Sequence, residues 1–451
     1  GLISYADKYT GWCLPAFFLL KAQPYQALET TGEAMVKEQI NESKLPVRLI
    51  LDLRALNKRI LRKSAASWPQ ESCRNILNRL RGSKVLTSLD FNQAYWQMRL
   101  SEKCKRYTGH NLINLHFILQ RAPLGLAISG SCWAAMLQKR LIQNGLSTHV
   151  LAFVDDCMLA TKEASEHKEY LIKLLTTFKE AGWKLKLKKC FFYLNNTDVL
   201  IYGWSLSLRH DTIQADPEKL KFLLKMERPK TTRQARRFVG LINVYHDAFE
   251  KVAEHLGPLF ELCSPTKKFF WSEQCDFAFK QALKMIATAK LLHLPDFFEP
   301  FVAVTDAAKG QFASWAVYQR HKKSKKLVPI VYGSQCFRNA MANWSQYKSE
   351  AYAAIKCLKD HINFFSFNHG FLISDCSSLQ YLVRWEGSAT VLFNWNLFLC
   401  SLPISIIPVS ATSPLISWVD LFTRNTETKR KLHLNREAFN DKNDIFNTPI
   451  V

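Results

Sequence analysis

Two short apolar runs of this chain each lead into aspartates, and carboxylates in such positions can bind cations. Ala152-Phe153-Val154-Asp155-Asp156 breaks from apolar residues onto two adjacent acids, and Val85-Leu86-Thr87-Ser88-Leu89-Asp90 ends on a third. Both runs are typical of buried strands. A carboxylate at the end of such a strand is costly unless it is paired, hydrogen-bonded or bound to a cation. In a strongly basic chain, these three acids, the first acid cluster, favour Mg²⁺ held against a phosphate.

More acids follow later in the chain and show the same relation to apolar runs. Phe301-Val302-Ala303-Val304-Thr305-Asp306 and Phe371-Leu372-Ile373-Ser374-Asp375 predict two strands that end on an Asp. Between them, a helix from about Trp344 carries apolar residues at helical spacing, and Glu350 lies within that apolar face. We therefore expect Glu350 to point inward, toward the aspartates at the strand ends.

The composition predicts a globular protein with a polyanionic partner. The 451 residues favour about two to four domains, and 48% hydrophobic with 12% aromatic residues exclude a disordered chain. Lysine and arginine number 61 against 38 acids, and the net charge of +23 favours nucleic acid first and an anionic membrane second. The 12 cysteines are scattered without any C-x-x-C, so we expect no zinc site, no disulfides and a reducing compartment.

Neither a signal peptide nor a transmembrane segment is predicted. No charged segment followed by an apolar one opens the chain, and no uninterrupted apolar stretch is long enough to cross a bilayer. We therefore expect a cytoplasmic protein without a membrane partner. The chain begins at Gly1 without an initiator Met, so we also expect it to be a piece of something longer.

Between the two sets of acids the sequence becomes helical and basic. Asp216-Pro217-Glu218 combines a capping Asp, a Pro in the first turn and an early acid, and Thr231 with Gln234 fits a capping box. The basic residues of these two predicted helices suit a phosphate backbone, although a solvated charged face is the alternative for any one of them. The candidates for nucleic-acid contact are Lys219, Lys221, Lys225, Arg233, Arg236 and Arg237.

An ordered series of short motifs links these features. Val47-Arg48 with Asp52-Leu53-Arg54-Ala55-Leu56-Asn57 is similar to R-x-x-x-D-x-R-x-L-N, and Phe153-Val154-Asp155-Asp156 is similar to the Y/F-x-D-D box. The other motifs, in chain order, lie at residues 86–97, 123–126, 189–192, 202–204, 238–245 and 270–271. The series resembles the reverse transcriptases of long-terminal-repeat retroelements, most closely the Ty3/gypsy-like group. The resemblance is collinear over about residues 10–425.

The resemblance implies roles for single residues near the first acid cluster. Asp90 and Asp155 would bind two metal ions, with Asp156 on the primer-terminus side. Four residues would contact the nucleotide: Arg48 at the triphosphate, Tyr95 under the sugar where it excludes a 2′-hydroxyl, Leu124 in the pocket, and Lys189 as proton donor to the pyrophosphate. Tyr202, Gly203 and Trp204 would form the primer grip. A core aromatic is the alternative reading of Tyr95 and Trp204.

The later acids resemble those of a ribonuclease H domain, which follow the order D, E, D, D. Thr305-Asp306-Ala307-Ala308 with Gly310 is similar to T-D-A-S-x-x-G, and Val419-Asp420-Leu421-Phe422-Thr423-Arg424 is similar to A-D-x-L-S-R. The second acid cluster is therefore Asp306, Glu350, Asp375 and Asp420. Two metal ions held by these acids would activate a water for cleavage of RNA in an RNA/DNA hybrid.

The fold implied is α+β, a right-hand polymerase followed by an α/β ribonuclease H-like domain. The expected segments are fingers and start of palm (1–84), palm (85–205), helical thumb (206–262), a short connection (263–298), ribonuclease H domain (299–425) and a polar tail or linker (426–451). The expected cofactor is Mg²⁺, two ions per site, with Mn²⁺ as an alternative. The expected partners are an RNA template, a DNA primer, the RNA/DNA hybrid and dNTPs, and a homodimer is consistent with so large a basic groove.

Several departures from the family pattern keep other interpretations open. Leu124 stands where Phe or Gln is usual, Ala127-Ile128-Ser129-Gly130 replaces x-N-A-P, and Cys376 follows Asp375 in an unusual context. A domesticated relative that binds nucleic acid without catalysis is therefore the alternative function. A reverse transcriptase of intron or telomerase type is disfavoured by the second acid cluster. Because no protease triplet and no integrase finger occur, we expect a segment of a longer polyprotein, with virus-like particles as one setting.

Overall fold

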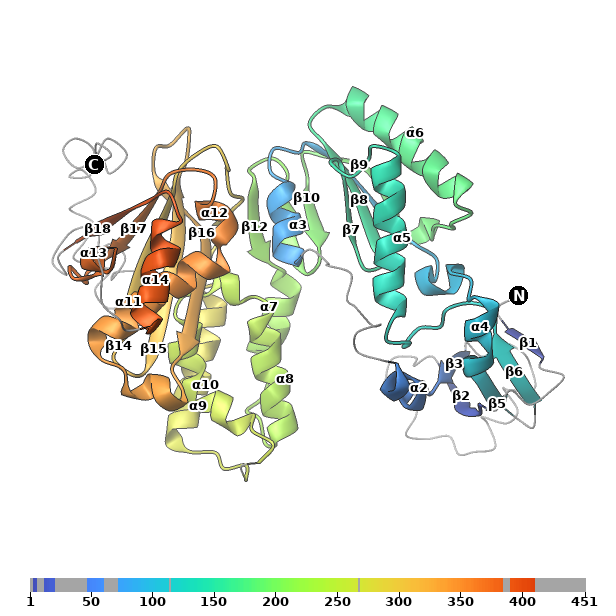
Figure 1. Cartoon of the computed structure of the whole chain (residues 1–451), viewed down its shortest axis with the longest axis horizontal. Helices are drawn as coiled ribbons and strands as arrows, with labels where there is room; N and C mark the ends of the chain where they lie inside the picture. The colour runs from blue at the N-terminus through green and yellow to red at the C-terminus, as the bar shows by residue number, and fades with distance from the viewer. Residues whose placement is uncertain are drawn as a thin grey trace. The chain divides into compact units, whose positions relative to one another are not determined.

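The computed structural model describes residues 3–5, 12–20, 47–60, 72–112, 115–266, 268–383 and 390–409, and the chain divides into two compact units, Gly1–Asn195 and Asn196–Val451 (Figure 1). Each unit combines helices with two β-sheets. Among the described residues, the helices are all too short or too polar to cross a membrane. Asp420 lies outside the described residues.

The first unit contains a four-stranded sheet that carries the first acid cluster. Its strand order is β7-β8-β4-β9, and all neighbours are antiparallel. The strands are β4 (Val85–Asp90), β7 (Val150–Phe153), β8 (Asp156–Thr161) and β9 (Phe191–Asn195). Helices α5 (Ser129–Gln143) and α6 (Ala164–Glu180) share one core with this sheet, in which Phe91, Trp133 and Phe178 are buried. This core fixes the strand ends that bear the acids.

A second sheet of the first unit has the order β1-β6-β5-β2-β3. Its strands are β1 (Ile3–Tyr5), β2 (Leu14–Leu20), β3 (Val47–Leu51), β5 (Gly109–Leu112) and β6 (Leu115–Leu119). Within the described residues of this unit there are also the short helices α2 (Arg54–Arg59), α3 (Cys73–Arg79) and α4 (Glu102–Lys105).

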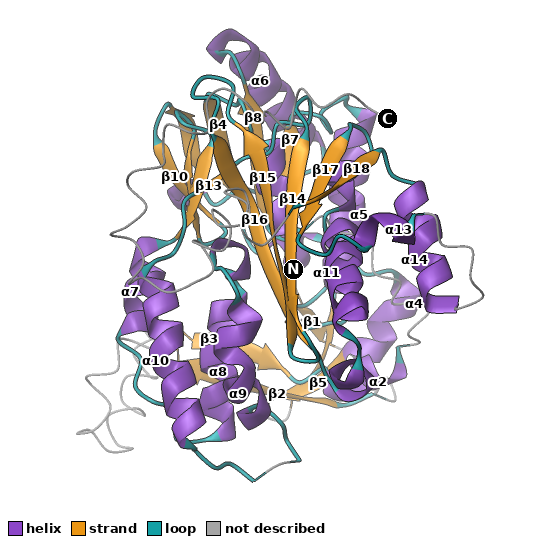
Figure 2. Ribbon diagram, turned by 90° about the vertical axis from the view of Figure 1, so that its left-hand side faces the viewer, coloured by secondary structure: helices purple, strands orange, loops and turns teal. Residues whose placement is uncertain are grey.

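The second unit begins with a small sheet of order β10-β11-β12-β13 and a group of helices. The strands are β10 (Asp198–Ile201), β11 (Trp204–Ser207), β12 (Thr212–Ala215) and β13 (Leu292–His293). The helices are α7 (Pro217–Leu224), α8 (Thr232–Asn243), α9 (Val252–Leu262) and α10 (Glu273–Ala287), of which α8, α9 and α10 lie side by side (Figure 2). Both predicted helix starts are confirmed, because Asp216 accepts a hydrogen bond from Glu218 N and Thr231 accepts one from Gln234 N.

The largest sheet of the second unit has the order β16-β15-β14-β17-β18. Its strands are β14 (Phe301–Ala308), β15 (Phe312–Arg320), β16 (Leu327–Cys336), β17 (Gly370–Ser374) and β18 (Ile404–Pro408). Helix α11 (Gln346–Asp360) packs on one face and shares a core with α14 (Thr390–Cys400). The predicted helix from Trp344 therefore exists, but it breaks at His361 before the short α12 (Ile362–Phe365), and α13 (Leu379–Leu382) follows β17.

Helix α9 contacts β15 and β16 of this sheet. Successive side chains of a strand point to opposite faces, so Trp315 and Val317 lie in the core with α11, whereas Ser314 and Tyr318 face the other way. Ser334 Oγ accepts a hydrogen bond from Ala253 N at the start of α9, at 2.8 Å. Both faces of the sheet are thus covered within the second unit.

Candidate active sites

The sheet register of the first unit brings the first acid cluster together. Asp90, the last residue of β4, lies directly opposite Asp156, the first residue of β8. Asp155 lies in the tight turn between β7 and β8, where Val154 adopts a left-handed backbone conformation with φ of 54°. A β-branched residue is unfavourable in that conformation, and such local strain is common at functional sites.

Two carboxylates of this cluster, those of Asp155 and Asp156, are partly buried and have a raised pKa. Burial raises the pKa of Asp155, and the Asp90 charge adds to that effect, while a hydrogen bond from Tyr95 opposes it. Burial also raises the pKa of Asp156, together with the charges of Asp90 and Asp155. The Oδ1 atom of Asp155 is buried and has no hydrogen-bond partner. An unsatisfied carboxylate oxygen among other acids suits a bound cation.

Lys189, a predicted residue of the nucleotide site, lies beside Asp90 of this cluster. Its Nζ donates a hydrogen bond to Asp90 Oδ2 at 3.0 Å, and this contact raises the pKa of the lysine. The ammonium is more than half exposed. A protonated lysine therefore neutralises part of the acid cluster and remains accessible from solvent.

Leu124 lies in a turn of the first unit that is held by a side chain distant in the sequence. Leu124 is half exposed in a turn in which Gly125 has φ of 93°. Asn57 fixes this turn, because its Nδ2 donates to Gly125 O and its Oδ1 accepts from Ala127 N, each at 2.9 Å. Asn57 is the last residue of the motif at residues 48–57, but the sequence alone does not predict this contact with a distant turn. Arg48 lies in β3, and its side chain is outside the described part of the structure.

Tyr202 and Gly203 form the turn between β10 and β11 in the second unit, and Trp204 is the first residue of β11. Gly203 has φ of 83°, and a Cβ atom there would lie 2.9 Å from the Tyr245 hydroxyl and 3.0 Å from Lys219 Nζ. Trp204 is buried and meets the Tyr245 ring edge to face. Burial and the charge of Asp216 raise the pKa of Tyr245 to about 12. The positive φ and these close atoms favour glycine in the turn, which packs against Lys219 of α7 and against Tyr245, two residues after α8.

The predicted basic residues of α7 and α8 differ in their surroundings. Lys221 pairs with Glu218 at 2.8 Å, and Arg236 Nε donates to Cys263 O at 2.7 Å. The Arg237 guanidinium lies 5.9 Å from the centre of the Phe222 ring. The remaining predicted contacts are Lys219 and Lys225 on and after α7, and Arg233 in the first turn of α8.

Three members of the second acid cluster meet at one end of the large sheet. Asp306 lies in β14, and Asp375 follows β17, which runs parallel to β14. Glu350 of α11 is buried, as predicted, and its Oε1 accepts hydrogen bonds from Ala307 N at 3.2 Å and Gln346 Nε2 at 2.6 Å. Its Oε2 is buried without a partner. Burial and the charges of Asp375 and Asp306 raise the pKa of Glu350 to about 8.

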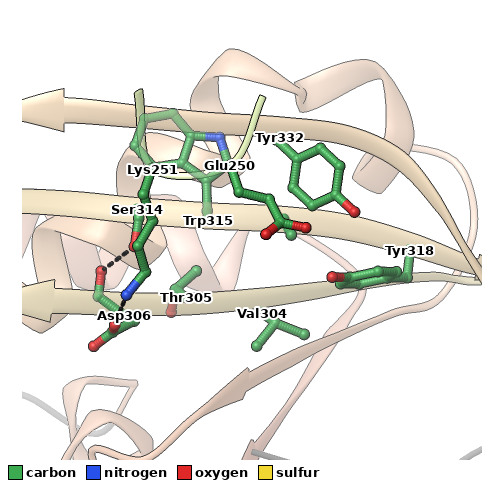
Figure 3. Close-up of a pocket in the computed structure, with 10 residues that line it drawn as sticks. Glu250, Lys251, Val304, Thr305, Asp306, Ser314, Trp315, Tyr318 and Tyr332 are labelled. Atoms are coloured by element: carbon green, nitrogen blue, oxygen red, sulfur yellow. Dashed lines mark hydrogen bonds and ion pairs between the residues drawn. The ribbon is translucent and has the colours of Figure 1, made fainter. Parts of the chain in front are cut away.

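Lys251 is a residue of this site that sequence reasoning missed. Its Nζ lies 3.5 Å from Asp306 Oδ2, and its neighbour Glu250 lies in the same small cavity as Tyr318 and Tyr332 (Figure 3). No local motif marks this lysine in the sequence. Only the packing of α9 on the sheet brings it to Asp306.

Both acid clusters have donors that suit a divalent metal ion. Mg²⁺ prefers carboxylate oxygens, and each cluster contains a buried carboxylate oxygen that lacks a partner. Within the described ranges, no three His, Cys, Asp or Glu side chains adopt the close arrangement of a metal site. Lys189 and Lys251 each pair with one acid of a cluster, Asp90 and Asp306 respectively.

Two protein families match successive parts of the chain. Residues 39–242 match the family described as reverse transcriptase (RNA-dependent DNA polymerase), and residues 271–372 match the RNase H-like domain found in reverse transcriptase. The first match contains the whole first acid cluster. The second contains Asp306 and Glu350.

Similar curated proteins are polyproteins of transposons. The chain is 26% identical over 348 residues to the retrovirus-related Pol polyprotein from transposon 412 of Drosophila melanogaster, covering 77% of the chain and 27% of that protein. It is 23% identical over 313 residues to the transposon Tf2-3 polyprotein of Schizosaccharomyces pombe, covering 69% of the chain and 23% of that protein. The chain thus spans about a quarter of the length of these relatives.

Solved structures share the fold. The foamy viral protease-reverse transcriptase in complex with an RNA/DNA hybrid matches 92% of this chain and 52% of its own, with a TM-score of 0.71 and 19% identity. The same viral protein in complex with dsDNA matches 82% of this chain and 75% of its own, with a TM-score of 0.67 and 21% identity. The predicted α+β class is confirmed. The chain contains a reverse transcriptase domain followed by a ribonuclease H-like domain, and its homologues include the Pol polyproteins of Ty3/gypsy-like retrotransposons.

Proposed function

We propose that this chain is an RNA- and DNA-directed DNA polymerase that also cleaves the RNA strand of RNA/DNA hybrids, at two separate sites. One observation carries the proposal: each of the two sheets holds acids from distant segments, and in each cluster a buried carboxylate oxygen has no partner. Such acids are costly to keep unless a cation binds them. The two family matches support the assignment of one activity to each cluster.

At the first cluster, Asp90 and Asp155 would hold two Mg²⁺ ions, with Asp156 on the primer-terminus side and Mn²⁺ as a substitute. When bound, the ions lower the pKa of the attacking 3′-hydroxyl and neutralise the triphosphate. Tyr95 hydrogen-bonds the Asp155 carboxylate and would lie under the sugar, where its ring leaves no space for a 2′-hydroxyl. Lys189 carries a proton beside Asp90 and would give it to the departing pyrophosphate.

Residues of the fingers would bind the incoming dNTP. Arg48 would grip the triphosphate, since a guanidinium binds phosphate oxygens in pairs. Leu124 would contact the nucleotide from the turn that Asn57 holds by two hydrogen bonds. An exposed leucine side chain in that turn can make apolar contacts with the nucleotide but no hydrogen bonds. It would therefore respond to the shape of the nucleotide and not to the identity of its base.

The second unit would hold the template–primer duplex. Tyr202, Gly203 and Trp204 would contact the primer at a turn that favours glycine at its centre. Lys219, Lys225 and Arg233 would bind backbone phosphates. The foamy viral proteins with this fold were solved with an RNA/DNA hybrid and with dsDNA, which supports duplex nucleic acids as partners.

The second cluster would bind two metal ions for hydrolysis of the RNA strand. Asp306, Glu350 and Asp375 would be the ligands within the described residues, and Asp420 would complete the set. Glu350 is fixed by Ala307 N and Gln346 Nε2, so its second oxygen stays directed at the cluster. Recognition of the hybrid would rest on 2′-hydroxyls and backbone shape, without reading of bases.

A single reaction tests both activities. The protein is incubated with a 5′-labelled DNA primer on a differently labelled RNA template, dNTPs and Mg²⁺, and both strands are resolved on one gel. Primer extension with template shortening is the expected result. Duplex binding without either change would contradict the proposal and favour the non-catalytic relative that the residues near Leu124 suggest.

A further inference from the structure

A partly buried lysine from outside the large sheet pairs with the first aspartate of the second acid cluster, whose side chain is 43% exposed. Lys251 Nζ lies 3.5 Å from Asp306 Oδ2 and 3.9 Å from Glu254 Oε2, and its side chain is only 12% exposed. Figure 3 shows the side chain reaching down to Asp306 at one end of the small cavity. Because this ammonium is largely shielded from solvent, water and salt screen its charge less than that of a surface lysine.

Lys251 has an unusual backbone conformation for a lysine, which indicates that its side chain has a role at this place. The residue precedes α9 with φ of 49° and ψ of 39°, the left-handed region that glycine and asparagine adopt most readily. A lysine gains nothing from this conformation itself. The conformation turns the side chain toward the sheet, where it meets Asp306.

The residues around Lys251 hold it in this place. Glu250 lies among Tyr318 and Tyr332 in the cavity, and Lys290 Nζ lies 3.6 Å from Glu250 Oε1. On the other side, Ala253 N donates to Ser334 Oγ, and α9 packs on β16. These contacts restrain the backbone on both sides of Lys251 and keep its side chain beside Asp306.

We propose that Lys251 is a tethered counter-ion that weakens divalent metal binding at the second acid cluster until nucleic acid is present. Without metal, its ammonium pairs with Asp306 and balances part of the charge of Asp306, Glu350 and Asp375. A divalent cation arriving alone meets this fixed positive charge. A duplex brings phosphates that offset the ammonium, so metal binding and duplex binding reinforce each other. This role of Lys251 rests on the metal site of the proposed function, but it does not depend on RNA cleavage, because metal binding is measured separately.

Lys251 is thus a positioning residue for the ribonuclease H-like domain, and it comes from the helical segment that precedes this domain in the chain. Asp306, Glu350 and Asp375 all belong to the large sheet and α11, whereas Lys251 belongs to the start of α9. The strength of metal binding at this site would therefore depend on a contact between the two parts of the second unit.

Titration calorimetry of Mn²⁺ into the full chain tests this. The background carries Asp90→Asn, Asp155→Asn and Asp156→Asn, so that only the second cluster binds metal. Lys251→Asn keeps a residue that tolerates the left-handed conformation and removes the charge. We expect it to lower the dissociation constant of Mn²⁺ about tenfold, as loss of one nearby unit charge in a half-buried site implies. Lys251→Arg keeps the charge and is the matched control, with an expected change below about twofold.

Further measurements separate the possible outcomes. Glu254→Gln removes the second acid beside Lys251 and should weaken Mn²⁺ binding, the opposite sign to Lys251→Asn. Added hybrid duplex should shrink the difference between parent and Lys251→Asn. Equal or weaker Mn²⁺ binding by Lys251→Asn, or no binding by any variant, would overturn the inference. If the parent binds metal as expected but cleaves no RNA, the proposed ribonuclease activity fails while the role of Lys251 stands.

Discussion

A lysine accompanies one aspartate of each acid cluster, but the two pairs differ in exposure. The side chain of Lys189 beside Asp90 is 59% exposed, whereas that of Lys251 beside Asp306 is 12% exposed. Water and salt screen an exposed pair strongly, so Lys189 can leave Asp90 at little cost when a nucleotide or metal arrives. Lys251 has no such freedom. The two sites therefore differ in how easily a cation replaces their lysine.

Gly310 illustrates a residue that the structure requires beside Asp306. It has φ of 64°, and a Cβ atom there would lie 2.2 Å from the carbonyl oxygen of Ala342. We expect Gly310→Ala to lower the free energy of unfolding by roughly 2–4 kcal/mol through strain and backbone displacement. Urea unfolding of the full chain measures this.

Gly240 provides the matched control for that substitution. It lies in the middle of α8, and no heavy atom lies within 4 Å of its added Cβ. Gly240→Ala should therefore stabilise the protein by about 0.5–1 kcal/mol, the difference in helix propensity between the two residues. Similar effects of both substitutions would contradict the close approach at Gly310.

Among the elements, the helix starts could be predicted from the sequence because capping is a local interaction. Asp216 and Thr231 each accept a hydrogen bond from a backbone N–H two or three residues later, so neighbouring residues determine the outcome. The position of Lys251 could not be predicted, because it depends on how α9 packs against a sheet formed much later in the chain. The break at His361 was also missed, since the apolar spacing continues across it.

Two arginines of α8 differ in their contacts, so their substitution separates an effect on nucleic-acid binding from an effect on stability. Arg233 is exposed in the first turn of α8, whereas Arg236 donates to Cys263 O after α9. We expect Arg233→Ala to weaken duplex binding and to lower the slope of log affinity against log salt by about one. Arg236→Ala should cost about 1 kcal/mol of stability because a hydrogen bond between elements is lost. Fluorescence anisotropy at several salt concentrations and urea unfolding compare the two variants, and a reversed pattern would refute this division.

We expect His167, which lies in α6, to make the stability of the first unit depend on pH. This buried imidazole lies 2.7 Å from Thr87 Oγ1 and 2.9 Å from Thr161 Oγ1, which joins α6 to β4 and β8. Burial lowers its pKa from the ordinary value of 6.5. Below about pH 6.5, the unfolded state therefore binds a proton at His167 that the folded state does not bind. The free energy of unfolding decreases as the pH falls, until the pH reaches the lower pKa of the folded state.

Substitution of His167 by Asn removes this titration. His167→Asn should cost about 1–2 kcal/mol at pH 7.5, and its deficit relative to the parent should shrink as the pH falls to 5. Urea unfolding at several pH values gives the difference between the two proteins, in which the effects of the buried His110 and His255 cancel. The exposed His210→Asn is the control and should follow the parent. A constant deficit at all pH values would contradict the assignment.

For the whole chain, the sequence predicts which acids belong to each cluster better than it predicts the contacts that support these clusters. The motif series predicts which acids form the two clusters, and the strand register places Asp90 opposite Asp156. The contacts that support them, such as Asn57 on the Leu124 turn, join segments that are far apart in the sequence and have no local signal. Asp420 lies outside the described residues, so the fourth member of the second cluster stays a prediction.

The measurement that tests the central claim most directly uses two single variants in the hybrid assay. Asp155→Asn and Glu350→Gln each replace one carboxylate by an amide of the same shape, and each affects a different cluster. With a labelled RNA template and DNA primer, we expect Asp155→Asn to abolish primer extension and to keep template cleavage, and Glu350→Gln to do the reverse. Loss of both activities in either variant, with the fold and duplex binding retained, would contradict two separate sites.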